Sequence, residues 1–180
     1  MKLLEKLKFP TSSNISKTKN LPEQSDLYNI VVNAPSGTPI ELSSFRGKHM
    51  LFVNVASECG FTPQYRELQK LSDSFEDQLI VIGLPCNQFG NQEPGSADQI
   101  QTFCERNFGI TFLVTEKVDV KGAKQHPLYA WLTKKEFNGF KNSSVKWNFQ
   151  KYLVDDKGKL VDYFYSIIKP MSTKITRHLK

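Results

Sequence analysis

Three cysteines are the residues of this chain best suited to chemistry: Cys59, Cys86 and Cys104. An odd number does not suit a closed set of disulfides, and their wide spacing does not match a zinc ribbon or knuckle. Cysteine is also a common buried residue, so each one taken alone favours a packing role. Redox or nucleophilic chemistry therefore needs support from the surroundings of each cysteine.

Cys59 has the most informative surroundings. It follows an almost continuous apolar run at residues 50–56, which is typical of a central strand covered on both faces. Thr62 and Pro63 follow it and predict the start of a helix, with a capping hydroxyl and then a residue that needs no N–H there. Active sites of open α/β sheets gather at such strand-to-helix turns. The helix dipole favours a thiolate here, whereas the adjacent Glu58 opposes it, and the position favours a nucleophile.

Cys104 is expected on a helix. A second apolar run at residues 79–84 ends at Pro85, and a turn-rich loop follows over residues 90–95. Ser96 and Gln99 then form a capping box, and Gly109 can close the helix that they begin.

The remaining pattern predicts the fold class. A strand is expected near Val118, a helix over 127–132, a hairpin of strands over 149–154 and 160–165, and a closing helix over 172–179. Strands and helices that alternate and then end in a hairpin predict an α/β protein, with a central mixed β-sheet flanked by helices on both faces. Residues 1–24 are polar and lysine-rich and are expected to form a flexible leader, so that 25–180 make up one domain.

The composition limits the kinds of partner that we expect for this protein. No apolar run approaches the roughly 18 residues of a membrane span, and the N-terminus lacks the apolar block of a signal peptide, so a cytoplasmic protein without stable membrane insertion is expected. The formal charge is +6, but the lysines alternate with carboxylates and form no basic stripe. Nucleic acid is therefore not an expected partner. The three histidines show no metal-site spacing, and no metal or cofactor is implied.

Three segments resemble the signatures of the glutathione peroxidase family: residues 54–62 (NVASECGFT), 85–90 (PCNQFG) and 147–149 (WNF), with QEPG at 92–95 after the second. Three motifs in the family order are far more specific than any one of them. The resemblance runs from about Leu27 to the C-terminus. It implies a thioredoxin-like fold and a peroxidase that reduces hydrogen peroxide and organic hydroperoxides in antioxidant defence.

The resemblance also implies roles for particular residues. Cys59 corresponds to the peroxidatic residue, and Gln88, Trp147 and Asn148 complete its catalytic tetrad. Amides and an indole N–H are neutral donors, which stabilise a thiolate and charge on the peroxide oxygen without having to titrate. Each has a plainer alternative, with Trp147 in the core and the two amides bonded to local backbone.

Cys104 matches the resolving cysteine of the non-selenium, two-cysteine members of the family. Its attack on the Cys59 sulfenic acid would form a Cys59–Cys104 disulfide, which thioredoxin is expected to reduce in preference to glutathione. Cys86 is expected to be structural. The short stretch 134–146 before the third signature is similar to that of monomeric members.

Other functions fit the sequence less well. A peroxiredoxin of the usual signature has Pro and Thr shortly before its nucleophile, and residues 54–58 supply neither. A thioredoxin-type oxidoreductase needs a Cys-x-x-Cys pair, which residues 59–62 lack. The main alternative is a peroxide sensor that uses the same sulfur to pass its oxidation to a partner protein.

Overall fold

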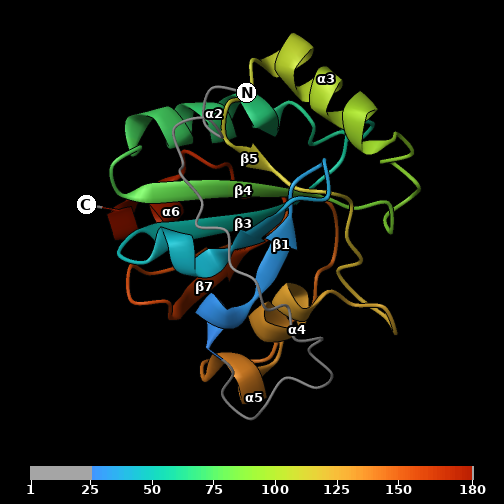
Figure 1. Cartoon of the computed structure of the whole chain (residues 1–180). Helices are drawn as coiled ribbons and strands as arrows, with labels where there is room; N and C mark the ends of the chain where they lie inside the picture. Colours follow the sequence, from blue (N-terminus) through green and yellow to red (C-terminus); the bar gives the residue numbers. More distant parts are fainter. Residues whose placement is uncertain (1–25, 180) are drawn as a thin grey trace.

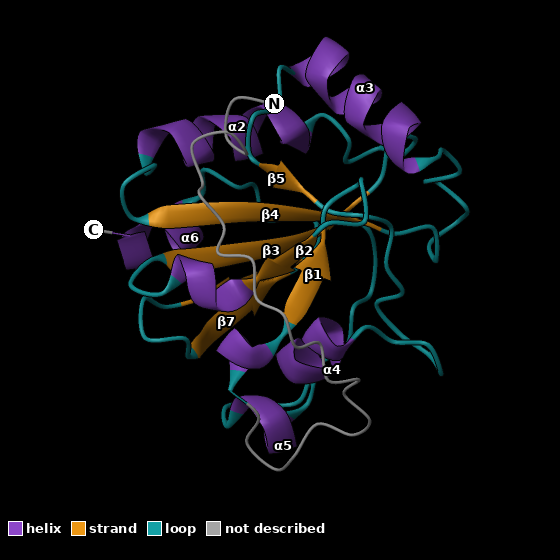
Figure 2. Cartoon of the chain, in the orientation of Figure 1, coloured by secondary structure: helices purple, strands orange, loops and turns teal. Residues whose placement is uncertain are grey.

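A five-stranded mixed sheet organises the computed structural model, which describes residues 26–179 (Figures 1 and 2). The strand order is β5-β4-β3-β6-β7. The central strand β3 pairs in parallel with β4 and antiparallel with β6, and β4 pairs in parallel with β5, while β6 pairs antiparallel with β7. The strands span His49–Val55 (β3), Leu79–Pro85 (β4), Leu113–Val114 (β5), Lys151–Val154 (β6) and Leu160–Phe164 (β7).

Helices cover both faces of this sheet, as the sequence predicts (Figure 1). Side chains of β3 alternate between two core clusters, with Met50 and Phe52 on one face and Leu51 and Val53 on the other. We call these clusters the α4 core and the α2–α3 core. The first is covered by α4 (Pro127–Thr133) and the second by α2 (Gln64–Ser74), α3 (Ala97–Phe108) and α6 (Thr173–Thr176).

Smaller elements complete the fold. A two-stranded antiparallel ribbon, β1 (Val31–Asn33) and β2 (Pro39–Glu41), packs with the α4 core, and α5 (Lys135–Asn138) follows α4. Short 3-10 helices lie at Leu27–Asn29, Leu42–Phe45 and Arg177–Leu179. Within residues 26–179, no helix is both long and apolar enough to cross a membrane.

Most expected elements are confirmed, and their ends are shifted in a few places. The hairpin strands begin at Lys151 and end at Phe164, and the closing helix is shorter than expected, at Thr173–Thr176. The strand expected near Val118 was misplaced: the edge strand is β5, while Val118 only donates its N–H to the Pro85 carbonyl (2.9 Å) beyond it. The expected leader, residues 1–24, lies outside the described residues.

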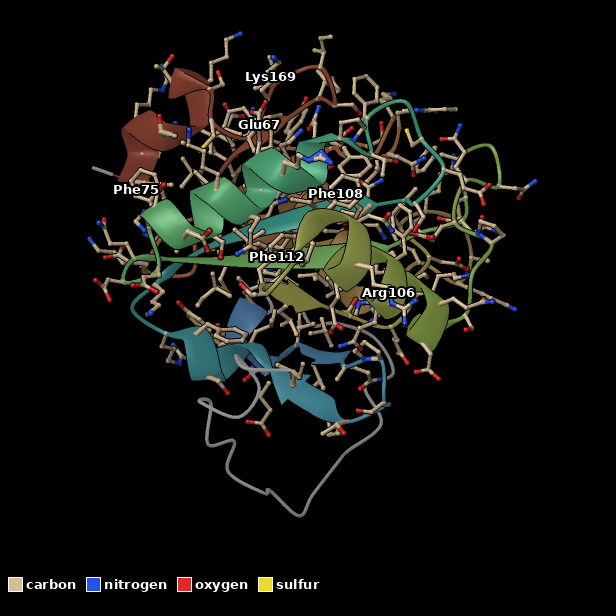
Figure 3. All side chains as sticks on the ribbon, turned by 90° about the horizontal axis from the view of Figure 1, so that it is seen from above. Glu67, Phe75, Arg106, Phe108, Phe112 and Lys169 are labelled. Carbon is tan, nitrogen blue, oxygen red and sulfur yellow. The ribbon has the colours of Figure 1, made fainter. Side chains whose placement is uncertain are left out.

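The helix that carries Cys104 has both predicted ends. The Ser96 hydroxyl accepts from the Gln99 N–H, and the Gln99 side chain accepts from the Ser96 N–H, which completes the capping box. Gly109 ends α3 in the left-handed conformation, at φ 62°. Phe108, in the last turn of α3, packs between α3 and α2, where its ring contacts Tyr65 and Arg66 (Figure 3).

Candidate active site

A tight turn after β3 holds Cys59. The Cys59 N–H donates to the Thr62 hydroxyl oxygen (3.0 Å), and that hydroxyl donates to the Ala56 carbonyl (2.8 Å). The sequence predicted Thr62 as a helix cap, but α2 begins at Gln64 without a side-chain cap. The Thr62 hydroxyl is used inside the turn instead, because the buried Cys59 N–H needs an acceptor there.

Cys59 is nearly buried, with 8% of the residue exposed, and its sulfur accepts a hydrogen bond from the Phe61 N–H (3.4 Å). A backbone N–H aimed at sulfur stabilises negative charge on it. The turn therefore presents the sulfur close to the surface with a fixed donor beside it.

Two amides from distant segments meet next to this turn. Asn148 is fully buried, and its Nδ2 donates to the Gln92 Oε1 (3.0 Å) and the Phe89 carbonyl (3.5 Å). The main-chain carbonyl of Gln92 accepts from the N–H of Glu58, the residue before Cys59 (3.0 Å). Hydrogen bonds thus join the third signature, the QEPG segment and the Cys59 turn.

Gln88 lies in a different environment from the one expected. Its Oε1 accepts from the N–H groups of Val120 (2.8 Å) and Lys121 (3.1 Å), and its Nε2 donates to the Lys121 carbonyl (2.9 Å). Both ends of the amide are therefore used to fix the 120–121 segment. The glutamine that contacts Asn148 is Gln92, the first residue of the QEPG motif, and the sequence does not predict this contact.

Trp147 is at the surface rather than in the core, because 40% of it is exposed. Its ring packs against Phe89, with centroids 5.7 Å apart, and its carbonyl accepts from the Asn54 side chain (3.1 Å). Phe89 also provides the carbonyl that receives the Asn148 amide. Trp147 and Asn148 are thus held against the segment that carries Gln92.

The backbone after Asn148 makes an unusual turn. Phe149 has φ 62°, a left-handed conformation that is rare for a large side chain. Hydrogen bonds hold this turn from three sides: Phe149 N–H to the Asn54 carbonyl (2.6 Å), the Ser166 hydroxyl to the Asn148 carbonyl (2.5 Å), and Lys151 Nζ to the Phe149 carbonyl (2.7 Å). Lys151 is fully buried, which lowers its pKa to about 7 against the opposing effect of Glu67.

The three cysteines are free thiols, and the sheet separates them into two groups. Cys59 and Cys104 belong to the α2–α3 core, whereas Cys86 belongs to the α4 core. Cys104 is 1% exposed, and burial raises the pKa of its thiol to about 11, with a smaller opposing effect from Tyr65. Cys104 is therefore a poor nucleophile while α3 stays in place.

No group of three or more His, Cys, Asp or Glu side chains placed to hold a metal ion occurs among the described residues. The side chains that hydrogen bonds link to the Cys59 turn through Gln92 are neutral amides. Such a site can stabilise a thiolate and developing oxygen charge.

Comparison with known proteins identifies relatives over most of the chain. The glutathione peroxidase family model matches residues 27–133. "Glutathione peroxidase homolog BsaA" of Staphylococcus epidermidis is 48% identical over 149 residues, which cover 82% of this chain and 94% of that protein. "Glutathione peroxidase-like peroxiredoxin HYR1" of Saccharomyces cerevisiae is 43% identical over 153 residues, covering 84% of this chain and 94% of that protein.

Two solved structures are also similar to this chain, one from a relative and one that shares only the fold. GPX1 of T. cruzi superposes with a TM-score of 0.65 at 31% identity, covering 86% of this chain and 96% of that one. A thioredoxin family protein of Chlorobium tepidum superposes with a TM-score of 0.55 at 14% identity, covering 84% and 93% of the two chains, which shows a shared fold. The predicted thioredoxin-like fold is thereby confirmed.

Proposed function

The chain belongs to the glutathione peroxidase family and is a peroxidase of thioredoxin-like fold, and from this premise we propose that Cys59 is its peroxidatic nucleophile. The observation that carries the proposal is the hydrogen-bonded link from the Cys59 turn to Asn148: the Glu58 N–H donates to the Gln92 main-chain carbonyl, and Asn148 donates to the Gln92 side chain. The substrates are hydrogen peroxide and organic hydroperoxides.

The first step is attack by the Cys59 thiolate on the terminal peroxide oxygen. The O–O bond breaks, the sulfur becomes a sulfenic acid, and water or an alcohol leaves after taking up a proton. The Gln92 amide N–H and the Trp147 indole N–H are the neutral donors for the charge that develops on oxygen. Asn148 acts through Gln92, because its Nδ2 donates to the Gln92 Oε1 and the Phe89 carbonyl and thereby orients the Gln92 amide. Gln92 takes the role that the family resemblance assigned to Gln88, because the Gln88 amide is bonded to residues 120–121.

The second step forms a disulfide between Cys59 and Cys104. Both thiols belong to one core cluster, but Cys104 is buried on an intact, doubly capped helix. A disulfide needs Cα atoms roughly 4.4–6.8 Å apart, so α3 has to open locally to bring the sulfur forward. Opening also exposes the thiol to water, which returns its pKa toward the ordinary range.

Thioredoxin is the proposed reductant, and glutathione the less favoured one. A protein dithiol exchanges efficiently with an exposed disulfide, and a disulfide that holds α3 open lies at the surface. The three free cysteines fit a reducing compartment, in keeping with a cytoplasmic protein. The short 134–146 stretch supports a monomer by family resemblance.

A peroxide sensor is the second candidate function. The buried, weakly acidic Cys104 slows resolution, which leaves time for the Cys59 sulfenic acid to react with a partner protein. Steady-state turnover with thioredoxin separates the two functions: rapid peroxide-dependent NADPH oxidation supports the enzyme, and accumulation of a mixed disulfide with another protein supports the sensor.

The test is to compare Cys59→Ser, Cys104→Ser and Cys86→Ser with the wild type in an assay with peroxide, thioredoxin, its reductase and NADPH. Cys59→Ser is expected to lose activity. Cys104→Ser is expected to consume one equivalent of peroxide and then stop. Cys86→Ser is the matched control and should stay within about twofold of the wild type, because the sheet separates Cys86 from the other two cysteines. Turnover by Cys59→Ser would refute the proposal.

A further inference from the structure

Glu93 is a buried carboxylate that the proposed peroxidase mechanism leaves unused. Its side chain is fully buried, and neither carboxylate oxygen makes a hydrogen bond of ordinary geometry among the described residues, although the Ser57 hydroxyl and N–H are near enough to lower its pKa. The main chain around it is well satisfied, since its N–H donates to the Asn87 side chain (2.9 Å) and its carbonyl accepts from Lys117 Nζ (2.7 Å). Lys117 thus binds the backbone of Glu93 and leaves the carboxylate without a bonded cation.

A buried carboxylate without a bonded cation or a well-formed hydrogen bond is costly, so an ordinary packing role would be better served by an apolar or amide side chain. Buried acids of this kind are concentrated at sites where a proton moves. The position of Glu93 within the fold therefore bears on what the carboxylate does.

Glu93 lines a pocket of about 370 Å³ that lies between the two elements carrying the reactive cysteines. One wall is the start of the Cys59 turn, another is the QEPG segment, and the third is α3. The lining residues are Ser57, Glu58, Glu93, Pro94, Gly95, Gln99, Ile100 and Phe103. Ile100 lies one helical turn before Cys104, and both are buried in the α2–α3 core. Glu93 therefore shares a pocket with residues from the turn that carries Cys59 and from the helix that carries Cys104.

The charges around Glu93 connect it with both cysteine-bearing elements. Burial raises the pKa of its carboxyl group; the Ser57 hydroxyl and N–H and the Lys117 ammonium act against this, and Glu58 adds to it. Glu93 in turn contributes, with Glu105, to the raised pKa of the Cys104 thiol, while Tyr65 opposes it. Ser57 lies two residues before Cys59, so one carboxylate interacts with groups on either side of the future disulfide.

We propose that Glu93 accepts the proton of the Cys104 thiol as the disulfide forms and passes it to the hydroxyl that leaves Cys59. The inference rests on the proposed function, in which Cys104 resolves the Cys59 sulfenic acid. The Cys104 S–H bond breaks, its proton goes to the carboxylate, and its electron pair forms the S–S bond while the S–O bond of the sulfenic acid breaks. The proton then leaves with that oxygen as water. The formal oxidation state of the Cys104 sulfur rises from −2 to −1, that of the Cys59 sulfur falls from 0 to −1, and Glu93 returns to its starting state.

The decisive variant is Glu93→Gln, which keeps the shape and removes the proton acceptor. Reduced protein is mixed with one equivalent of hydrogen peroxide and quenched at intervals, and sulfenic acid and disulfide are quantified between pH 6 and 9. Sulfenic acid formation should stay within twofold of the wild type, and disulfide formation at pH 7 should be at least tenfold slower. This defect should shrink as pH rises, because the Cys104 thiol then ionises without help. Glu93→Asp, which keeps a carboxylate, should recover part of the rate.

Glu105→Gln is the matched control, because Glu105 is an exposed carboxylate that also raises the pKa of the Cys104 thiol but does not line the pocket. It should leave disulfide formation unchanged.

The stability of Glu93→Gln gives a further readout. Ionisation of a carboxyl group whose pKa is raised opposes folding, so Glu93→Gln should melt at a higher temperature than the wild type at pH 7–8. The gain should fade below the ordinary carboxyl pKa of 4.5. A purely structural Glu93 would instead lower the melting temperature when replaced.

Equal disulfide rates in Glu93→Gln and wild type across the pH range would overturn the proposal, as would an equal slowing by Glu105→Gln. Failure of the wild type to form any Cys59–Cys104 disulfide would overturn the resolving role of Cys104 and this proposal with it. The two failures are distinguishable because only the second is seen in the wild type.

Discussion

The sulfur of Cys59 and the amides of Gln92 and Asn148 come from three distant stretches of chain that a few hydrogen bonds bring together. Cys59, Gln88 and Asn148 each lie inside a signature segment, which is why the sequence singles them out. Residue types do not reveal that the side chain bonded to Asn148 is that of Gln92, while that of Gln88 is bonded to residues 120–121. The two glutamines lie on either side of Gly90 and Asn91, which have φ of 64° and 54°. This left-handed turn determines which amide faces Asn148, and residue types alone do not reveal its direction.

A pair of alanine variants tests the two glutamines against each other. Gln92→Ala should lower kcat/KM for hydrogen peroxide roughly tenfold to a hundredfold, because a donor to the developing oxygen charge is lost. Gln88→Ala should keep kcat/KM within about twofold and lower the free energy of unfolding by about 1–3 kcal/mol, because the N–H groups of Val120 and Lys121 lose their acceptor. Stopped-flow kinetics and urea unfolding measure the two effects. If Gln88→Ala lowered kcat/KM and Gln92→Ala left it unchanged, Gln88 would be the catalytic glutamine.

At the scale of elements, α3 and β6 show what local signals predict and what they leave open. Both ends of α3 follow from Ser96, Gln99 and Gly109, since these residues act within one turn of chain. The depth of Cys104 in the α2–α3 core does not follow from them, because it depends on how α3 docks against the sheet and α2. Likewise, the apolar pattern predicts β6 but gives no reason to bury Lys151, whose ammonium binds the carbonyl of a left-handed Phe149.

Lys151 on β6 gives a pH-dependent prediction. Its pKa is lowered from 10.5 to about 7, so between these pH values the unfolded chain binds a proton that the folded chain does not. Wild-type stability should therefore fall relative to Lys151→Met as pH decreases from 10 to 7, by about 3–5 kcal/mol, and change little below that. Urea unfolding at both pH values measures the difference, in which the other titrating groups cancel.

The same variant should reduce kcat/KM for peroxide severalfold, because the Phe149 carbonyl loses the ammonium that holds the turn after Asn148. A stability difference between wild type and Lys151→Met that does not vary with pH would show that Lys151 keeps its ordinary pKa in the folded protein. Full activity of the variant would show that the turn does not depend on it.

At the scale of the whole molecule, the alternation of strands and helices followed by a hairpin predicted the mixed sheet with helices on both faces. The ribbon β1–β2 was missed, because strands of three residues are too short to show an alternating pattern. The order β5-β4-β3-β6-β7 also depends on long-range pairing. That order has a chemical consequence: the sheet separates Cys86 from Cys59 and Cys104, so only the latter two share a core.

The most direct test of this account is to map the cysteines after a single oxidation. Reduced, full-length protein receives one equivalent of hydrogen peroxide, free thiols are then alkylated, and the peptides are identified by mass spectrometry. The account predicts a Cys59–Cys104 crosslink with Cys86 alkylated, and loss of that crosslink after addition of reduced thioredoxin. Consumption of the peroxide with Cys59 still alkylated, or a crosslink of Cys59 to Cys86, would contradict it.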